Sequence, residues 1–483
     1  MIKLLFTYLL GGAASGIISI LSTFLITRMF STEAYAKAML FTSLLNILFC
    51  FCNMGMDQVF VRYFYELNYK HKLSLLFLRC LSVVFFGVVL VSSVLFYLGK
   101  DLLRWLEIDD PVLIPLLVIG MILFSLHRFT QLISRLKEQA VVYGAADVVG
   151  AISFLIVFLT LFYVFSTDYL TLILGRLISM ALVVGWLLFL YRKDISLPIR
   201  TKNHFFQPAE LKDFLKYGAP SLFSLSLAWL FINLDKYFIL KYSNYHELGI
   251  YTAAFDLTAP LVFIQSAFTT AWAPRMNNML IHRPFKSKKI FFLTFEKLSL
   301  ALTFLFLTTV FFKNDLILML GSNFHPAVNV FPWLLFAPYF WALSEVVVAG
   351  IVKSKKSYWS MPISFAAVCA NILGCCLLIP IMGATGAAIS SAISYFVFFL
   401  ARWYIAFRYY RFKINYVKFA TYLGFICVYI VFSDTAKYSL TFLFMVVVLF
   451  FERKWLHKDI RSVMNLFLLK YNSRMLNVDV FQK

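Results

Sequence analysis

The chain contains 483 residues, of which 62% are hydrophobic and only 14% are charged. A composition this apolar excludes a water-soluble globular protein, and the apolar runs are too long for the strands of an outer-membrane barrel. The net charge of +21 would suggest a nucleic-acid partner in a soluble protein. In a membrane protein such an excess of basic residues records topology, so we expect no nucleic-acid partner.

Apolar runs long enough to cross a hydrocarbon core recur along the whole chain, and we predict about fourteen transmembrane helices. They cover residues 5–29, 38–61, 75–97, 112–132, 142–165, 170–191, 218–241, 249–272, 292–312, 329–352, 359–380, 385–407, 417–433 and 438–452. The predicted fold class is therefore an all-α polytopic membrane protein.

The segments that connect these runs alternate between strongly basic and weakly charged. The basic set includes residues 192–217 and residues 453–483, whereas the other set holds few basic residues. Because basic loops stay in the cytoplasm, we expect a multi-pass protein with both termini cytoplasmic. Residues 453–483 also alternate basic and apolar side chains at helical spacing, which predicts an amphipathic tail bound to anionic membrane lipids.

A weak internal repeat appears when the two halves of the sequence are aligned with an offset of about 213 residues. The segment that starts at Ile26 then lies over the segment Ile239–Gly249, and Arg28 lies over Lys241. Six predicted spans separate the two copies, so they share one orientation, and transporters bind substrate between such halves. The predicted domains are residues 1–191 and 218–407 as two six-helix halves, 192–217 as a basic cytoplasmic linker, 408–452 as two further helices, and 453–483 as the tail.

Polar and charged residues lie inside the seventh and eighth predicted spans. They are Asn233, Asp235, Lys236 and Asp256. Such residues are costly in lipid, so they must face protein or a water-filled cavity, and they mark a candidate transport path. Consecutive helical residues point about 100° apart, so Asp235 and Lys236 cannot form one salt bridge and each needs its own partner or water.

The same segment resembles the oligosaccharide-lipid flippases, the polysaccharide transporters of the multidrug/oligosaccharidyl-lipid/polysaccharide exporter superfamily. In that family an Asp followed by a basic residue lies in the seventh helix, and a G-[IL]-Y-x-A-A motif opens the eighth. The matching residues are Asp235, Lys236, Gly249, Ile250, Tyr251, Ala253 and Ala254, and Ala271–Arg275 closes the eighth span in the family's style.

This resemblance implies a Wzx-type flippase of the bacterial inner membrane. Such a flippase moves undecaprenyl-diphosphate-linked oligosaccharide repeat units from the inner to the outer leaflet for O-antigen or capsule assembly, by alternating access. It also implies the polysaccharide polymerase and the chain-length regulator as partners. The residues expected to bind substrate are Arg28, Arg62, Arg128, Arg176, Asn233 and Lys236. The residues expected to carry coupling ions or balance charge are Asp57, Asp147, Asp235, Asp256 and Glu345.

The predicted topology sorts these charges by depth into two vestibules, which suits a cavity that opens to one side at a time. The outer set is Arg28, Arg176, Asp235, Lys236 and Asp256; the inner set is Asp57, Arg62, His127, Arg128, Asp147, Glu345 and Arg402. The alternative for each residue is an interhelical pair that only fixes packing.

Three other functions compete with this one. A cation-coupled multidrug exporter of the same superfamily would share the fold. The flippase for lipid-linked peptidoglycan precursor is a relative, but its arginine-rich first-helix motif is not evident here. A membrane-embedded polymerase or glycosyltransferase would be an enzyme, yet the outward loops are short. Walker A, zinc-site and GxSxG patterns are absent from the sequence, so we expect no catalytic residues, metal, cofactor or use of ATP.

Overall fold

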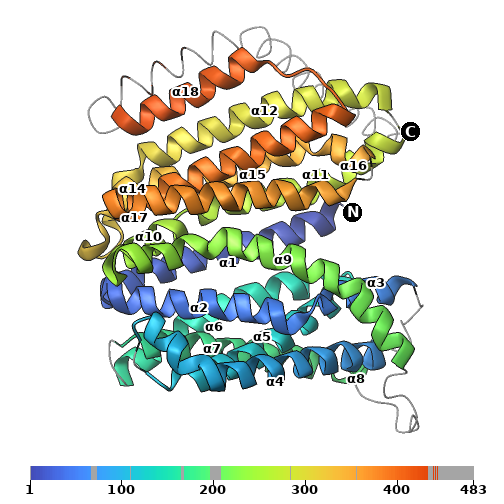
Figure 1. Cartoon of the computed structure of the whole chain (residues 1–483), viewed down its shortest axis with the longest axis vertical. Helices are drawn as coiled ribbons and strands as arrows, with labels where there is room; N and C mark the ends of the chain where they lie inside the picture. The colour runs from blue at the N-terminus through green and yellow to red at the C-terminus, as the bar shows by residue number, and fades with distance from the viewer. Residues whose placement is uncertain are drawn as a thin grey trace, which may run out of the picture. The chain divides into compact units, whose positions relative to one another are not determined.

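The computed structural model describes residues 2–66, 73–108, 110–164, 168–195, 208–282, 284–354 and 356–432, together with residues 439, 441, 443 and 446. Every regular element within these ranges is a helix (Figure 1). The N-terminal half contains α1 (Ile2–Met29), α2 (Thr32–Asn53), α3 (Met56–Glu66), α4 (Leu73–Trp105), α5 (Leu113–Leu136), α6 (Ala140–Val164), α7 (Tyr169–Leu190) and α8 (Arg192–Ile195).

The second half runs from α9 to α17, and α18 follows it. Its elements are α9 (Pro208–Tyr242), α10 (Tyr245–Asp256), α11 (Ala259–His282), α12 (Pro284–Phe311), α13 (Lys313–Leu318), η2 (Ser322–Phe324), α14 (Ala327–Leu334), α15 (Phe336–Val347), α16 (Ala349–Ser354), η3 (Ser357–Trp359), α17 (Ser360–Tyr409) and α18 (Tyr416–Phe432). Within the described residues, nine helical segments are long and apolar enough to cross a membrane, or ten if α10 and α11, which meet at 47°, form one bent span. The prediction of an all-helical multi-span membrane protein is confirmed.

The long element α17 is a helical hairpin. Gly383 has a φ of 55° and interrupts the helix. Ser390 Oγ donates to the carbonyl oxygen of Asn371 at 2.8 Å, and Asn371 Nδ2 lies 3.4 Å from Ser394 Oγ. On a straight helix these residues would be about 30 Å apart, because each residue advances the chain by about 1.5 Å. The two arms therefore run side by side and correspond to the predicted spans 359–380 and 385–407.

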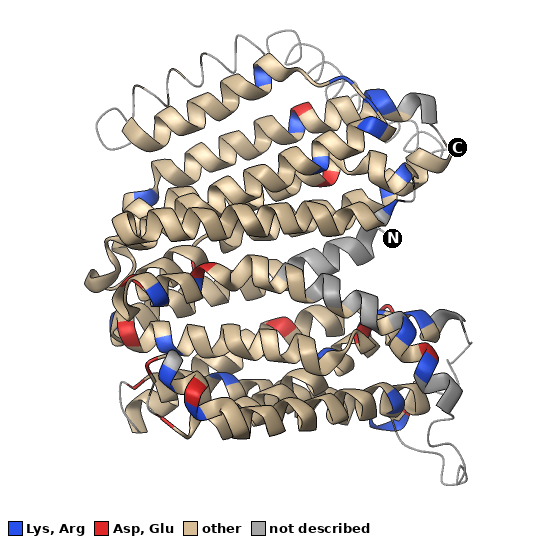
Figure 2. Cartoon of the chain, viewed as in Figure 1, with Lys and Arg blue, Asp and Glu red and all other residues tan. Residues whose placement is uncertain are grey.

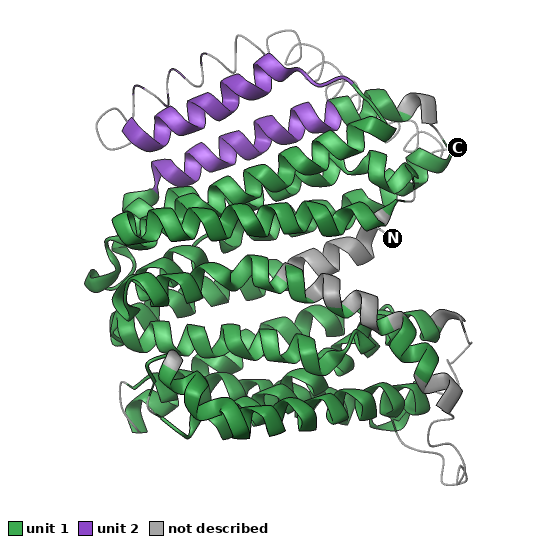
Figure 3. Cartoon of the chain, viewed as in Figure 1, with its two compact units in different colours: residues 1–292, 313–412 green, residues 293–312, 413–483 purple. Residues whose placement is uncertain are grey.

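The helices cluster into two compact units (Figure 3). Unit 1 contains residues 1–292 and 313–412, and unit 2 contains residues 293–312 with the chain from Lys413 onward. Within unit 2, the ring of Phe295 lies 5.6 Å from that of Phe419, and Lys418 Nζ lies 3.9 Å from Glu296 Oε1. The predicted tail 453–483 and almost all of the predicted span 438–452 lie outside the described residues. The cavity and the charged clusters described below lie within unit 1.

The start of the second helix in each half agrees with the internal repeat. Ser31 caps α2 by accepting a hydrogen bond from the backbone N–H of Ala34 at 3.2 Å. Asn244 caps α10 in the same way, from the N–H of Glu247 at 2.9 Å. Side-chain caps of this kind satisfy backbone donors that a helix start leaves free. The two caps lie 213 positions apart, at the offset found in the sequence.

The second predicted span, 38–61, is broken in the structure. Met54 and Gly55 have positive φ angles of 46° and 73°, so α2 ends at Asn53 and α3 begins at Met56. The break lies against α9, because a Cβ atom on Gly55 would be 2.3 Å from the carbonyl oxygen of Gly218. Close approach of two backbones at this point requires glycine.

Helix α9 connects the two halves and begins ten residues before the predicted span 218–241. Its first turns carry Phe214, which is 2% exposed and packs 4.7 Å from the ring of Tyr63 on α3. Its later turns pack on the second arm of α17, where the rings of Phe231 and Tyr395 are 4.5 Å apart. Burial of Phe214 explains why part of the basic linker continues as helix, since an amphipathic segment is stabilised mainly by its packed face.

Candidate functional site

Two adjoining compartments with shared lining residues lie between the halves of unit 1, and together we call them the cavity. The N-half compartment, of about 420 Å³, is lined mainly by α1, α5, α6, α7 and the start of α11. The interface compartment, of about 390 Å³, is lined mainly by α1, α2, α7, α9, α10 and the start of α11. The lining residues that both compartments share are Ser19, Ser22, Phe154, Arg176, Ala259 and Val262. Volumes of roughly 300–1,000 Å³ are typical of ligand-binding sites.

Arg176 on α7 lies where the two compartments meet. Its guanidinium carbon is 5.6 Å from the ring centroid of Phe154. The guanidinium forms no ion pair and no hydrogen bond with any residue that the structure describes. Its five N–H donors are therefore free for a ligand, and a guanidinium in this state favours a planar or tetrahedral oxyanion.

Lys236 on α9 brings a second positive charge to the same cavity, from the other half. Its Nζ donates to Ser43 Oγ at 2.8 Å and to Asn233 Oδ1 at 3.2 Å, and it lies 5.6 Å from the ring centroid of Phe255. Within the described ranges it forms no salt bridge, but the carboxylate of Asp256 attracts it electrostatically. Each half thus supplies one cation that forms no salt bridge with a described residue, and Asp256 interacts electrostatically with both.

Asp256 is the acidic group of the interface compartment. It ends α10 just before the bend to α11, and it accepts a hydrogen bond from the hydroxyl of Tyr35 on α2. Tyr35 is fully buried and its ring meets that of Phe324 edge to face at 5.6 Å. This bond joins a cavity-lining carboxylate of the second half to the first half.

Further contacts join the halves at the same end, which we call the α2–α10 seal. Thr32 Oγ1 is 2.8 Å from His246 Nδ1, and a Cβ atom on Gly249 would be 2.3 Å from the carbonyl oxygen of Thr32. Arg28 Nε donates to the carbonyl oxygen of Met319 at 3.0 Å. Arg28, expected to bind substrate, therefore lies in the seal and does not line either compartment.

Asp147 on α6 and His127 on α5 line the N-half compartment together with Arg176. One carboxylate oxygen of Asp147 accepts from Gln131 Nε2 at 2.7 Å. The sequence assigned Arg176 to an outer vestibule and His127 and Asp147 to an inner one. The structure instead brings all three to a single compartment, because side chains of α5, α6 and α7 converge there.

Asp235 lies next to the cavity but does not line it. The residue is 3% exposed, and its carboxylate accepts hydrogen bonds from Tyr251 at 2.6 Å, from the hydroxyl of Ser391, and from Cys375 Sγ at 3.6 Å. It forms no salt bridge with any described residue, and as expected it is not paired with Lys236 in this way. In the described ranges no group of three or more His, Cys, Asp or Glu side chains could hold a metal ion.

Asp57 and Arg128 form an ion pair inside the N-terminal half. Arg128 Nη2 is 3.1 Å from Asp57 Oδ2, and Asn53 Nδ2 donates to Asp57 Oδ1 at 3.0 Å. Asp57 is 3% exposed and lines neither compartment. Arg62 lies exposed on α3, also away from the cavity lining. The geometry thus matches the packing alternative for Asp57 and Arg128.

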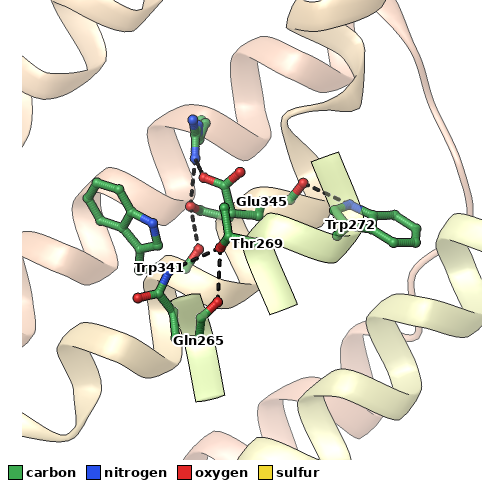
Figure 4. Close-up of polar contacts among 7 residues, drawn as sticks. Gln265, Thr269, Trp272, Trp341 and Glu345 are labelled. Atoms are coloured by element: carbon green, nitrogen blue, oxygen red, sulfur yellow. Dashed lines mark hydrogen bonds and ion pairs between the residues drawn. The ribbon is translucent and has the colours of Figure 1, made fainter. Parts of the chain in front are cut away.

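Glu345 forms the corresponding pair in the second half (Figure 4). Arg402 Nη1 donates to Glu345 Oε1 and to Ser344 Oγ, both at 2.8 Å. Trp272 Nε1 donates to the Glu345 carbonyl oxygen at 3.1 Å, so side chains of α11, α15 and α17 meet here (Figure 4). The cluster also contains Gln265, whose Nε2 donates to Thr269 Oγ1 at 3.0 Å. Glu345 is therefore neutralised within its own half.

The sequence alone did not identify several partners of the embedded charges. Tyr35, Ser43 and Ser391 are polar residues in apolar helices, and nothing in their spacing distinguishes them from residues that bond to their own helix. Tyr251 belongs to the G-[IL]-Y motif, which marked the segment but not the contact with Asp235.

Comparisons with known proteins agree with this architecture. A protein-family model described as polysaccharide biosynthesis protein matches residues 2–280. No match is found among curated protein sequences. The structure is similar to that of the lipid II flippase MurJ in an inward closed conformation, with a TM-score of 0.69 and 12% identity over 93% of this chain and 99% of that one.

Two MATE transporters share the architecture. A multidrug resistance MATE family transporter of the MOP superfamily, in an inward-facing conformation, has a TM-score of 0.60 and 13% identity over 85% of this chain and 96% of that one. The Vibrio cholerae MATE transporter VcmN in its bent form has a TM-score of 0.54 and 15% identity over 85% and 98%. At these identities the likeness establishes the fold, and the substrate has to be argued from the cavity.

Proposed function

Because the chain belongs to the polysaccharide biosynthesis protein family, we propose that it translocates undecaprenyl-diphosphate-linked oligosaccharide repeat units for O-antigen or capsular polysaccharide assembly. The direction of transport is from the cytoplasmic to the periplasmic leaflet of a bacterial inner membrane. The partners are the lipid-linked substrate, anionic membrane lipids, and the polymerase and chain-length regulator that use the product. No chemical bond changes, so the protein acts as a transporter and not as an enzyme.

The observation that carries this proposal is the pair of cations that line one compartment, form no salt bridge with a described residue and have the single carboxylate of Asp256 between them as an electrostatic neighbour. Arg176 comes from the first half and Lys236 from the second. A diphosphate between them would form charge-assisted hydrogen bonds with both, and such bonds to phosphate are among the strongest in proteins. The lipid tail stays in the bilayer while the polar head crosses through the cavity.

The second part of the proposal is alternating access, in which the cavity opens to one side of the membrane at a time. The α2–α10 seal closes one end of the cavity through Tyr35 and Asp256. Figure 2 shows basic residues gathered at the opposite end of the unit 1 helices, where Lys353 ends α16 and Arg408 ends α17. Basic loops are cytoplasmic, so the seal faces the periplasm in this state and both termini lie in the cytoplasm. Transport requires that the seal opens and that the cytoplasmic ends of the halves close.

Asp235 supplies the coupling group in this scheme. A buried carboxylate without a basic partner costs several kcal/mol unless it takes up a proton or holds a cation. The hydroxyls of Tyr251 and Ser391 and the thiol of Cys375 surround it, and the next residue along α9 is the cavity cation Lys236. A change in the occupancy of Asp235 would therefore act on the helix that carries one of the two substrate-binding cations.

Deletion of the gene tests the assignment. We expect surface polysaccharide to disappear and undecaprenyl-linked repeat units to accumulate on the cytoplasmic leaflet. Lys236→Gln should fail to restore the polysaccharide, whereas Lys241→Gln, one and a half turns further along α9 and exposed, should restore it. Normal surface glycan in the deletion strain, without accumulated intermediate, would contradict the proposal.

A cation-coupled multidrug exporter is the second candidate, and two carboxylates in the cavity favour it. Asp147 and Asp256 line the compartments and could hold an organic cation. The two functions differ in a simple assay: cells that express the protein would extrude a cationic dye if this candidate is right, and the deletion strain would keep its surface glycan.

A further inference from the structure

The two compartments differ in the chemistry of their walls. The interface compartment contains Lys236 and Asp256, whereas the N-half compartment contains Asp147, His127, Ser15 and Ser179; Arg176, Ser19 and Ser22 line both. A ligand that spans both compartments would place its anionic group in the interface compartment and a chemically different group in the N-half compartment. This inference rests on the proposed function and deepens it.

The serine hydroxyls of the N-half compartment present acceptors to the cavity. Ser15 donates to the carbonyl oxygen of Gly12, Ser22 to that of Ile18, and Ser179 to that of Arg176, each at 2.9 Å. A hydroxyl has one donor hydrogen and two lone pairs, so these groups have already used their donor within their own helix. Only their lone pairs remain for a ligand.

Asp147 adds a charged acceptor to the same wall. Gln131 Nε2 donates a hydrogen bond to Asp147 Oδ1, and among the described residues nothing donates to the second oxygen of Asp147, Oδ2. A wall of this kind favours a ligand rich in hydrogen-bond donors, and Asp147 disfavours a second carboxylate beside it, because like charges repel strongly where water is scarce. Hydroxyl groups of a neutral sugar meet both conditions. Arg176, which also lines this compartment, binds the diphosphate in this scheme.

The order of the groups also agrees with a lipid-linked saccharide. In such a molecule the first sugar is attached directly to the diphosphate. Arg176 lies where the two compartments meet, so a diphosphate between Arg176 and Lys236 has its sugar end next to the N-half compartment. The cavity volume of about 420 Å³ is sufficient for a small saccharide and not for a long chain.

We propose that the N-half compartment is a saccharide subsite for the neutral, hydroxyl-bearing sugars next to the diphosphate, and that Asp147 is the residue that excludes acidic sugars. Gly150 offers a way to fill this subsite without disturbing the helix. A Cβ atom there would meet only Val183 Cγ2, at 3.6 Å, which is an ordinary contact, and Gly150 lines the compartment. Gly185, on the exposed side of α7, has nothing within 4 Å of such an atom and serves as the matched control.

The test uses the purified full-length chain in lipid nanodiscs and three probes. They are farnesyl diphosphate, farnesyl diphosphate linked to a neutral disaccharide, and the same compound with its first sugar oxidised to a uronic acid. We expect the neutral sugar to tighten binding about tenfold over farnesyl diphosphate, and the uronic acid to remove that gain. Asp147→Asn should abolish the discrimination between the neutral and the acidic probe.

Gly150→Leu should remove the gain from the neutral sugar and leave the affinity for farnesyl diphosphate unchanged, whereas Gly185→Leu should change neither. Farnesyl diphosphate binding without any gain from the neutral sugar would overturn the subsite alone. Discrimination that survives Asp147→Asn, or a sugar gain that survives Gly150→Leu, would do the same. If farnesyl diphosphate does not bind the unaltered protein, the proposed function fails and the subsite fails with it.

Discussion

Two arginines within unit 1 should respond in opposite ways to the same substitution. Arg176 has a free guanidinium in the cavity, whereas Arg402 is bound to Glu345 and Ser344 at 2.8 Å. Loss of Arg176 removes a charge-assisted contact with the ligand, worth about 1.5–3 kcal/mol, which corresponds to about a 10- to 150-fold loss of affinity. Its removal costs the fold little, because no described residue depends on it for an ion pair or hydrogen bond.

Loss of Arg402 has the reverse consequence. Its side chain is 17% exposed and that of Glu345 is 13% exposed, so Arg402→Gln leaves a carboxylate with little access to water and no partner. Breaking such a pair costs about 3 kcal/mol. We therefore expect Arg402→Gln to lower the thermal stability of the protein while the surviving folded fraction still binds farnesyl diphosphate. Arg176→Gln should bind it weakly and unfold near the temperature of the unaltered protein.

The measurement compares both variants in nanodiscs, with thermal unfolding in one experiment and equilibrium binding of farnesyl diphosphate in the other. The reasoning is refuted if Arg176→Gln destabilises the protein as much as Arg402→Gln does and leaves binding unchanged. That outcome would make Arg176 a packing residue.

Three further substitutions test the coupling group and the seal. Asp235→Asn should keep or improve the folded yield, because it removes a buried charge that has no salt bridge. It should lower transport in a complementation assay by about tenfold or more. Full complementation would show that Asp235 has only a packing role. Tyr35→Phe removes the hydrogen bond to Asp256 and should raise the open fraction of the seal about tenfold. A cysteine introduced into the cavity should then be labelled faster from the periplasm. An unchanged labelling rate would contradict the role of this bond in the seal. Gly249→Val places side-chain atoms against the Thr32 backbone, so it should either open the seal or lower the folded yield. Normal cysteine labelling together with a normal yield would show that the close approach of α10 to Thr32 is unimportant.

Hydropathy and charge in the sequence were sufficient to predict the helices, because the cost of exposing polar groups to lipid acts on each segment separately. The interruptions were harder to predict. Gly55 and Gly218 are ordinary glycines in the sequence, and only the crossing of α9 over the end of α2 explains why the second span breaks there. The early start of α9 likewise depends on the burial of Phe214 against α3.

For the charged residues inside the spans, too, the sequence predicted the positions and only the structure revealed the contacts. The sequence indicated which ionisable residues lie at bilayer depth, and it indicated that Asp235 and Lys236 need separate partners. It placed Arg128 and Glu345 with the functional groups, and the structure finds each of them in an ion pair within its own half. Arg176 carries the same charge as Arg128 and also lies in an apolar helix, yet its guanidinium faces the cavity without an ion-pair partner among the described residues.

The sequence by itself determined that this is a multi-span helical protein with two similarly oriented halves and with charged groups inside its spans. Those properties follow from local energetics, since each segment must satisfy its own backbone and hide its own polar groups from lipid. The tertiary structure decided which charges are neutralised and which face the cavity. That outcome depends on contacts between residues hundreds of positions apart, such as Tyr35 and Asp256, and no pattern within a single helix encodes them.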